Sequence, residues 1–119
     1  MTIFGWLTGR FSNRGRSLLL FERGMARANK HDHAGAITDY TTAIDRSETS
    51  ADVRARALYN RALAHFAAGD TSKGVDDINQ VLAMGAAHSN VKTMARQKLA
   101  CMEAQSQKRN SSTARVVAR

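Results

Sequence analysis

The chain has 119 residues, enough for one domain, and its composition of 43% hydrophobic and 24% charged residues is that of a globular protein. Its only cysteine is Cys101, which excludes an internal disulfide, and no stretch approaches the roughly 20 apolar residues that a membrane-spanning helix needs. These features favour a cytoplasmic protein. Because proline is absent and Ala, Arg, Leu, Met and Gln recur between short polar breaks, helix is expected over most of the length.

The formal net charge of +8 is unevenly distributed along the chain. Residues 1–30 carry a net charge of +5, residues 31–88 carry −3 and residues 89–119 carry +6. Basic ends of this kind suggest an acidic partner, which can be a protein, a nucleic acid or an anionic membrane, but they can equally serve only solubility. Nucleic-acid binding is expected to be weak and non-specific, since the centre is acidic and the C-terminal end has no aromatic side chain for base stacking.

The first element is an N-terminal segment, residues 1–15, that combines apolar and basic side chains. Its apolar residues are Ile3, Phe4, Trp6, Leu7 and Phe11. Together with Arg10, Arg14 and Arg16 they form the pattern of a membrane-surface anchor with a basic flank, although Gly5 and Gly9 weaken a helix here. The alternative is that this segment folds back over the helices that follow and packs against them.

An internal repeat appears when the chain is shifted along itself by 38 residues. The matched pairs include Leu20 with Leu58, Gly24 with Ala62, Asp32 with Asp70, Ala36 with Gly74, Tyr40 with Ile78 and Ala43 with Val81. In each copy, apolar residues recur at helical spacing in two stretches that a polar break separates. We therefore expect two antiparallel helical hairpins, over about residues 16–46 and 51–84.

Short polar residues and glycines predict where these helices begin and end. Asp32, Ser50 and Thr71 are expected as N-caps, because a short side-chain oxygen can accept a free amide of the first turn. Gly69 and Gly85 suit the left-handed turn that closes a helix.

Small residues indicate where the two helices of each pair touch. Gly24 and Ala62 lie in the first helices, and Ala36 and Gly74 lie in the second helices. Facing small side chains let antiparallel helices approach closely. A glycine inside a helix costs about 1 kcal/mol relative to alanine, which the close packing is expected to offset.

With these residues, the two copies resemble tetratricopeptide repeats, whose signature W-x2-L-G-x2-Y, A-x3-F and a late proline recurs every 34 residues. In the first copy Gly24, Ala36, Tyr40 and Ala43 match the signature. The departures are leucines at the tryptophan position (Leu20, Leu58), arginines at the leucine position (Arg23, Arg61), Arg27 and His65 at the tyrosine position, and no proline. The resemblance implies an all-α fold of antiparallel hairpins stacked as a short right-handed α-solenoid.

A third stretch, about residues 89–107, is expected to form one helix that caps the second hairpin. Its apolar stripe consists of Val91, Met94, Ala95, Leu99 and Met102. Cys101 lies within this stripe and is expected to be a buried structural thiol. Residues 108–119 contain no acid and little periodicity, and are expected to form a disordered basic tail.

No constellation of residues predicts catalysis, so we expect a protein that is not an enzyme and needs no cofactor. His31-Asp32-His33 offers two imidazoles and a carboxylate, but it lies in a tight turn where Asp caps a helix, and no third ligand is evident. No metal site is expected there. No histidine neighbours Cys101 in sequence to activate it as a nucleophile.

The resemblance to tetratricopeptide repeats implies that a partner protein or peptide binds the concave face formed by the first helix of each pair. The residues at these positions are Leu18, Phe21, Met25, Arg56, Tyr59, Asn60, Leu63 and Phe66. Such an aromatic and methionine-rich surface suits an apolar segment. The alternative is that these side chains are core covered by the N-terminal segment. Since two hairpins are fewer than the roughly three repeats such arrays need, self-association into a homo-oligomer would also supply the missing contacts.

Overall fold

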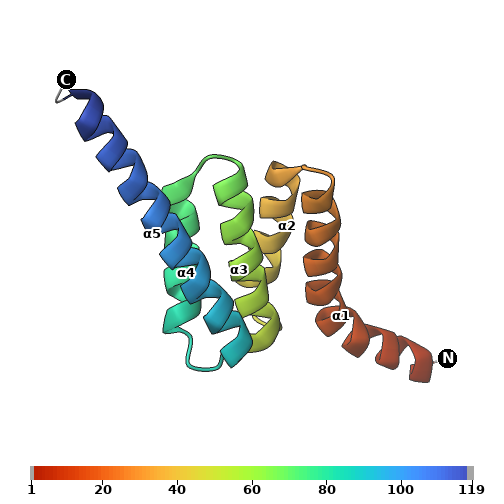
Figure 1. Ribbon diagram of the computed structural model, residues 1–119. Coiled ribbons are helices and arrows are strands. Elements are labelled where there is room, and N and C mark those ends of the chain that lie inside the picture. Colours follow the sequence, from red (N-terminus) through yellow and green to blue (C-terminus); the bar gives the residue numbers. More distant parts are fainter. Residues whose placement is uncertain (1, 118–119) are drawn as a thin grey trace.

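The computed structural model describes the backbone of residues 2–117 and the side chains of residues 15–117. Within these residues the chain forms five α-helices and no strand (Figure 1). They are α1 (Thr2–Asn29), α2 (His33–Asp45), α3 (Ala51–Ala67), α4 (Thr71–Ala83) and α5 (Ser89–Val117). The predicted all-α fold is confirmed.

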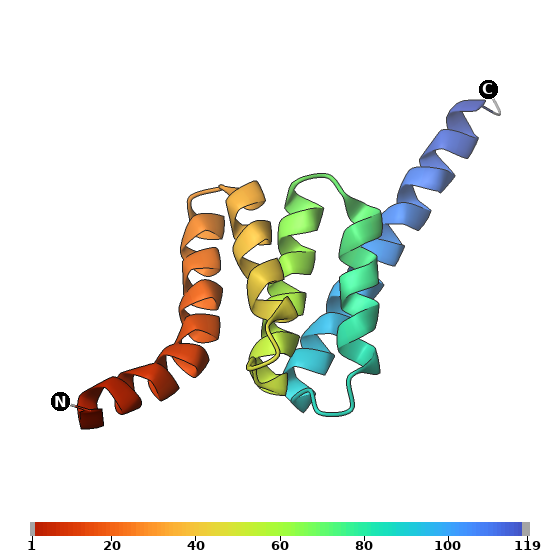
Figure 2. The same cartoon turned by 180° about the vertical axis from the view of Figure 1, so that it is seen from behind.

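The helices form two antiparallel hairpins, α1–α2 and α3–α4, that stand side by side with α2 packed on α3 (Figures 1 and 2). Helix α5 packs against α4 and α3 and closes one end of the row. The first turns of α1 and the last turns of α5 project beyond this body on opposite sides, which gives overall dimensions of 78 × 30 × 18 Å (Figure 2). No described helix is long and apolar enough to cross a membrane.

The hairpin turns lie where the sequence predicts them and have the same backbone conformation. Two residues after the end of each first helix lies a residue with positive φ, His31 in the first hairpin (62°) and Gly69 in the second (87°). The next amide reaches back to the helix: the Asp32 N–H donates to the Arg27 carbonyl at 2.9 Å, and the Asp70 N–H donates to the His65 carbonyl at 2.8 Å. This is the left-handed closing turn expected after an α-helix.

The N-caps are Asp32, Ser50 and Asp70, whose side-chain oxygens accept amides of the first turns of α2, α3 and α4. Two were predicted, but Thr71 was the wrong choice in α4: the aspartate before it is the cap, as Asp32 is in the first copy. Gly85 also differs from expectation, because its φ is not positive. Helix α4 instead ends in an extended residue, Met84.

The two glycines lie at the helix contacts, but the atoms nearest to each belong to an aromatic ring and not to the small residue that was predicted to face it. Gly24 faces the ring of Tyr40, and a Cβ added at Gly24 would lie 2.6 Å from Tyr40 Cε1. Gly74 faces the Phe66 ring in the same close manner. Tyr40 and Ile78 are fully buried beside these contacts. The core thus forms where each hairpin closes and where the hairpins meet.

The two ends of the chain differ from the sequence-based expectation. Helix α1 starts at Thr2, so residues 2–15 continue it and its first turns lean away from the body instead of folding back (Figure 2). Helix α5 runs to Val117, so residues 108–117 are helical and not a disordered tail. No glycine or proline follows Gly85, so no helix-breaking residue ends α5 early. Cys101 is exposed because α5 leaves the body there, which contradicts the predicted buried thiol.

Candidate functional site

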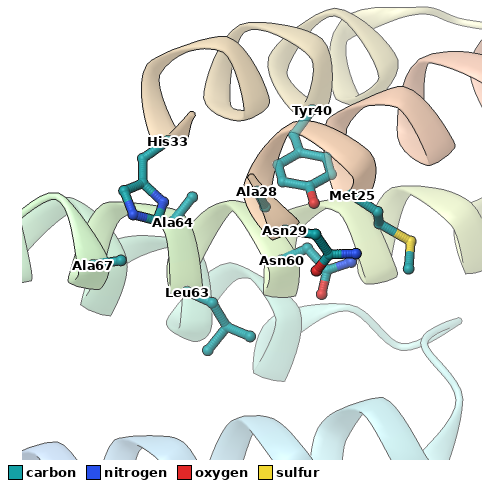
Figure 3. A pocket seen from close by; sticks show the side chains of 9 residues that line it. All are labelled: Met25, Ala28, Asn29, His33, Tyr40, Asn60, Leu63, Ala64 and Ala67. Atoms are coloured by element: carbon teal, nitrogen blue, oxygen red, sulfur yellow. The ribbon is translucent and has the colours of Figure 1, made fainter. Parts of the chain in front are cut away.

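A groove of about 300 Å³ lies between the two hairpins, at the ends of α1 and α3 that lead into the hairpin turns (Figure 3). Its lining residues are Met25, Ala28, Asn29, His33, Tyr40, Asn60, Leu63, Ala64 and Ala67. They come from α1, α2 and α3, so the groove exists only when both hairpins are packed together.

The apolar part of the groove follows from the spacing of residues on two helices. Met25 and Ala28 lie one turn apart on α1, and Leu63 and Ala67 lie one turn apart on α3. Residues one turn apart share a face of a helix, so each helix presents one apolar face to the groove. Met25 remains 40% exposed, which is high for a large apolar side chain at a helix contact. The groove therefore offers accessible apolar surface between small alanine side chains.

Four polar side chains edge this apolar surface. Asn29 and Asn60 carry amide groups that are not used in any side-chain hydrogen bond among the described residues. Tyr40 lies between the hairpins, and burial raises the pKa of its phenol, with the nearby Asp39 carboxylate as a smaller cause. The Nδ1 atom of His33 is buried and has no hydrogen-bond partner in the described part of the chain. Because Tyr40 and the His33 Nδ1 atom are buried, the groups accessible to a bound backbone are the amides of Asn29 and Asn60, which can donate and accept hydrogen bonds.

Of the side chains predicted for the concave face, the structure brings Met25, Asn60 and Leu63 together in the groove. Phe21 is only 2% exposed and belongs to the core, because it packs against Tyr40 and lies under the guanidinium of Arg56, whose Cζ is 4.9 Å from the ring centre. Arg56 itself is therefore engaged at the joint between the hairpins and does not line the groove.

The remaining three predicted residues lie elsewhere. Tyr59 and Phe66 are partly buried against the core cluster of the second hairpin, and Phe66 also fills the space beside Gly74 under Lys98. Leu18 is 42% exposed but does not line the groove.

Sequence reasoning missed Asn29 and His33 as lining residues. Asn29 lies one helical turn after Met25, as Ala67 lies one turn after Leu63, so the i, i+4 spacing was a usable signal. His33 was considered only as a metal ligand and rejected. In the structure it is the first residue of α2, and its place in the groove depends on the turn that precedes it.

One arginine–aspartate ion pair joins the two helices of each hairpin, and the two pairs are equivalent. Arg23 Nε and Nη2 donate to the Asp39 carboxylate at 2.9 and 2.7 Å, and Arg61 donates to Asp77 through the same atoms at 2.8 and 2.7 Å. The Arg23 guanidinium lowers the pKa of Asp39, and Arg27 contributes at 3.5 Å.

His65 lies beside the second ion pair, with its Nε2 atom 3.7 Å from Asp77 Oδ2. Burial lowers the pKa of His65, Asp77 opposes this shift, and the Arg61 charge adds to it. The His65 side chain is 12% exposed and lies at the polar contact between α3 and α4. It serves the hairpin contact and is remote from the groove lining.

The apolar N-terminal residues Ile3, Phe4, Trp6, Leu7 and Phe11 lie outside the residues whose side chains the structure describes. Among the described residues no group of three or more metal-ligating side chains comes together. The Asp32 carboxylate accepts the Gly35 amide at 3.0 Å, and the rings of His31 and His33 meet edge to face.

Comparison with known proteins identifies no relative from which a function could be carried over. No protein-family model, curated protein or solved structure matches this chain.

Proposed function

We propose that this chain is a non-catalytic protein-interaction module of tetratricopeptide type, which binds a short segment of another protein in the groove between its hairpins. The observation that carries the proposal is the groove itself, with Met25 and Leu63 presented from α1 and α3 and the amides of Asn29 and Asn60 at its edge. Apolar walls with a few convergent polar groups are the general form of a binding site.

The lining supports a ligand with apolar side chains and an accessible backbone. A volume of about 300 Å³ is at the lower end for ligand pockets, so we expect it to hold one or two apolar side chains. Methionine is flexible and polarizable, and Met25 can adapt to aliphatic or aromatic partners. The two asparagine amides can each donate to a carbonyl and accept from an N–H of the ligand backbone, independently of its sequence.

The resemblance to tetratricopeptide repeats supports the same surface. It implies ligand binding on the first helices of the hairpins, and both α1 and α3 contribute to the groove. Asn60 matches one asparagine of the set with which the chaperone-binding members grip a C-terminal carboxylate. The chaperone-binding subtype is not proposed, because Phe21 and Met25 occupy the positions of its carboxylate-binding lysine and asparagine.

Peptide selection with two matched methionine variants tests the proposal. A random peptide library is selected on the full chain, and the dissociation constant of the best peptide is measured by calorimetry. Met25 and Met94 are 40% and 42% exposed, but only Met25 lines the groove. We expect Met25→Glu to weaken binding at least tenfold and Met94→Glu to leave it unchanged. Equal affinity of the Met25→Glu variant would show that the ligand binds elsewhere.

A further inference from the structure

Three positions that recur at the 38-residue interval form the joint between the hairpins. In the second copy they are Arg54, Ala57 and Arg61. Arg54 Nε and Nη2 donate to the carbonyls of Ile44 and Arg46 at 3.0 and 2.9 Å, which satisfies the C-terminal end of α2.

The other two positions complete this joint. Ala57 is fully buried in the cluster that joins the two hairpins. Arg61 Nη1 donates to Thr41 Oγ1 of α2 at 3.1 Å. One face of α3 thus contacts α2 in three ways. Arg54 binds the C-terminal carbonyls of α2, Ala57 packs in the shared apolar cluster, and Arg61 binds a hydroxyl of α2.

In the first copy, the same three positions face no helix in the described residues. They are Arg16, Leu19 and Arg23, which together with Leu20 line an open pocket of about 210 Å³ on α1. We call this surface the open edge. Leu19 is 64% exposed, and the Arg23 side chain is 58% exposed compared with 16% for Arg61. Ala95, 38 residues after Ala57, is also fully buried, at the contact between α5 and the second hairpin.

Arg23 already makes the contacts within its own hairpin that Arg61 makes in the second hairpin. Like Arg61, it uses Nε and Nη2 to bind the aspartate of its own hairpin. This leaves the Nη1 atom, which in Arg61 binds the neighbouring helix, without a hydrogen bond among the described residues. Arg23 is thus held by Asp39 through Nε and Nη2, while its Nη1 group is unpaired among the described residues.

From this correspondence we propose that the open edge docks the C-terminal end of an acidic amphipathic helix from a partner protein. Arg16 binds the last carbonyls of that helix, as Arg54 does for α2, and Arg23 Nη1 binds a Ser, Thr or Asp side chain about one turn earlier. Leu19 is larger than the alanine at position 57, so the partner presents a small residue opposite it.

Charge selects an acidic partner over a second copy of this chain. Arg16, Arg23 and Lys30 are spaced by seven residues along one side of α1, and Arg16 and Lys30 form no salt bridge among the described residues, whereas Arg23 is paired with Asp39. Two copies that met edge to edge would bring the basic side chains of both together, which is unfavourable. Head-to-tail stacking is also blocked, because α5 covers α4, the helix that corresponds to α2. An acidic helix can form ion pairs with these basic side chains. The open edge is separate from the groove proposed above.

The test uses a peptide with the sequence of residues 34–48. These residues contain most of α2, the helix that packs on the equivalent face of α3. A side-chain staple on the solvent side holds the peptide helical. A second version carries Tyr40→Ala to make room for Leu19. Binding of the labelled peptides to the full chain is followed by fluorescence anisotropy. We expect at least one version to bind, and Leu19→Glu or Arg16→Glu in the chain to weaken that binding at least tenfold. Both side chains are exposed, so the variants are expected to fold.

Two controls separate this site from the groove and from self-association. Met25→Glu in the groove should leave peptide binding unchanged, and a peptide with Asp39→Asn, Asp45→Asn and Glu48→Gln should bind more weakly. The proposal is overturned if neither peptide binds, if Leu19→Glu binds as tightly as wild type, or if the peptide without acidic side chains binds equally well. It is also overturned if sedimentation shows a wild-type dimer that Leu19→Glu dissociates, because the occupant would then be a second copy.

Discussion

His31 and Gly69 occupy the same left-handed turn position in their hairpins, 38 residues apart, with φ of 62° and 87°. Glycine adopts this conformation freely, whereas any side chain with a Cβ is strained there by about 1–2 kcal/mol. The first hairpin therefore carries a backbone strain that the second avoids. His31 is exposed, so no burial of its ring offsets that strain.

Replacing His31 with glycine is expected to stabilise the protein. The relief of strain exceeds the entropy that glycine loses on folding, and a net gain of about 0.5–1 kcal/mol in the free energy of unfolding follows. The reverse change, Gly69→Ala, should cost about 1 kcal/mol. Urea denaturation of the two variants measures both effects, and a destabilised His31→Gly variant would contradict the account of this turn.

The close contact between α1 and α2 predicts opposite effects for two glycines of α1. An added methyl at Gly24 meets the buried Tyr40 ring, so Gly24→Ala should lower stability by about 1–3 kcal/mol despite the better helix propensity of alanine. No atom lies within 4 Å of a Cβ added at Gly15, so Gly15→Ala should raise stability by about 0.5–1 kcal/mol. Thermal denaturation of the pair provides the comparison. Equal effects would show that helix propensity alone decides.

The two ion pairs differ in burial, which predicts different costs for removing their arginines. Arg61→Ala leaves the Asp77 side chain, only 4% exposed, without its partner and should cost about 3–5 kcal/mol. Arg23→Ala should cost clearly less, because Arg23 is exposed and Arg27 remains 3.5 Å from Asp39. In the double variant Arg61→Leu with Asp77→Ala, most of the loss should be recovered. A larger loss from Arg23→Ala than from Arg61→Ala in guanidinium denaturation would be inconsistent with this assignment.

His65 predicts a dependence of stability on pH. Its folded-state pKa lies below the ordinary value of 6.5 because of burial, so the unfolded chain binds more protons as the pH falls through that value. Stability should therefore decrease on acidification from pH 7 toward the folded-state pKa of His65. His65→Gln should flatten this dependence, whereas His88→Gln, which changes an exposed histidine, should retain it. Denaturation midpoints of the three proteins at several pH values measure this dependence. If the midpoint of His65→Gln changes with pH as steeply as that of the wild type, the role of His65 is refuted.

Features that depend on local chemistry could be predicted from the sequence. The hairpin breaks, the Asp32 cap and the small residues Gly24 and Gly74 follow from turn and packing preferences that act within a few residues. The repeat interval extended these inferences from one copy to the other. It would also have corrected Thr71 to Asp70, had the match of Asp70 with Asp32 been applied to the caps.

Features that depend on what covers a helix could not be predicted in this way. Cys101 lies in an apolar stripe, but its exposure depends on the place where α5 leaves the body. Phe21 and Met25 are one turn apart on α1, and only the position of α3 makes the first buried and the second a groove residue. The groove was therefore predicted in part, through Met25, Asn60 and Leu63, while Asn29 and His33 depended on the turn geometry.

The most direct test of the proposed groove is a nitrogen–proton correlation NMR spectrum of the full chain titrated with the selected peptide. The side-chain amides of Asn29 and Asn60 report on the site itself, because each gives its own pair of signals. We predict that these signals, together with the backbone amide of Leu63, shift most on binding. If they stay unchanged while the largest shifts lie on α5 or around Leu19, the groove is not the binding site.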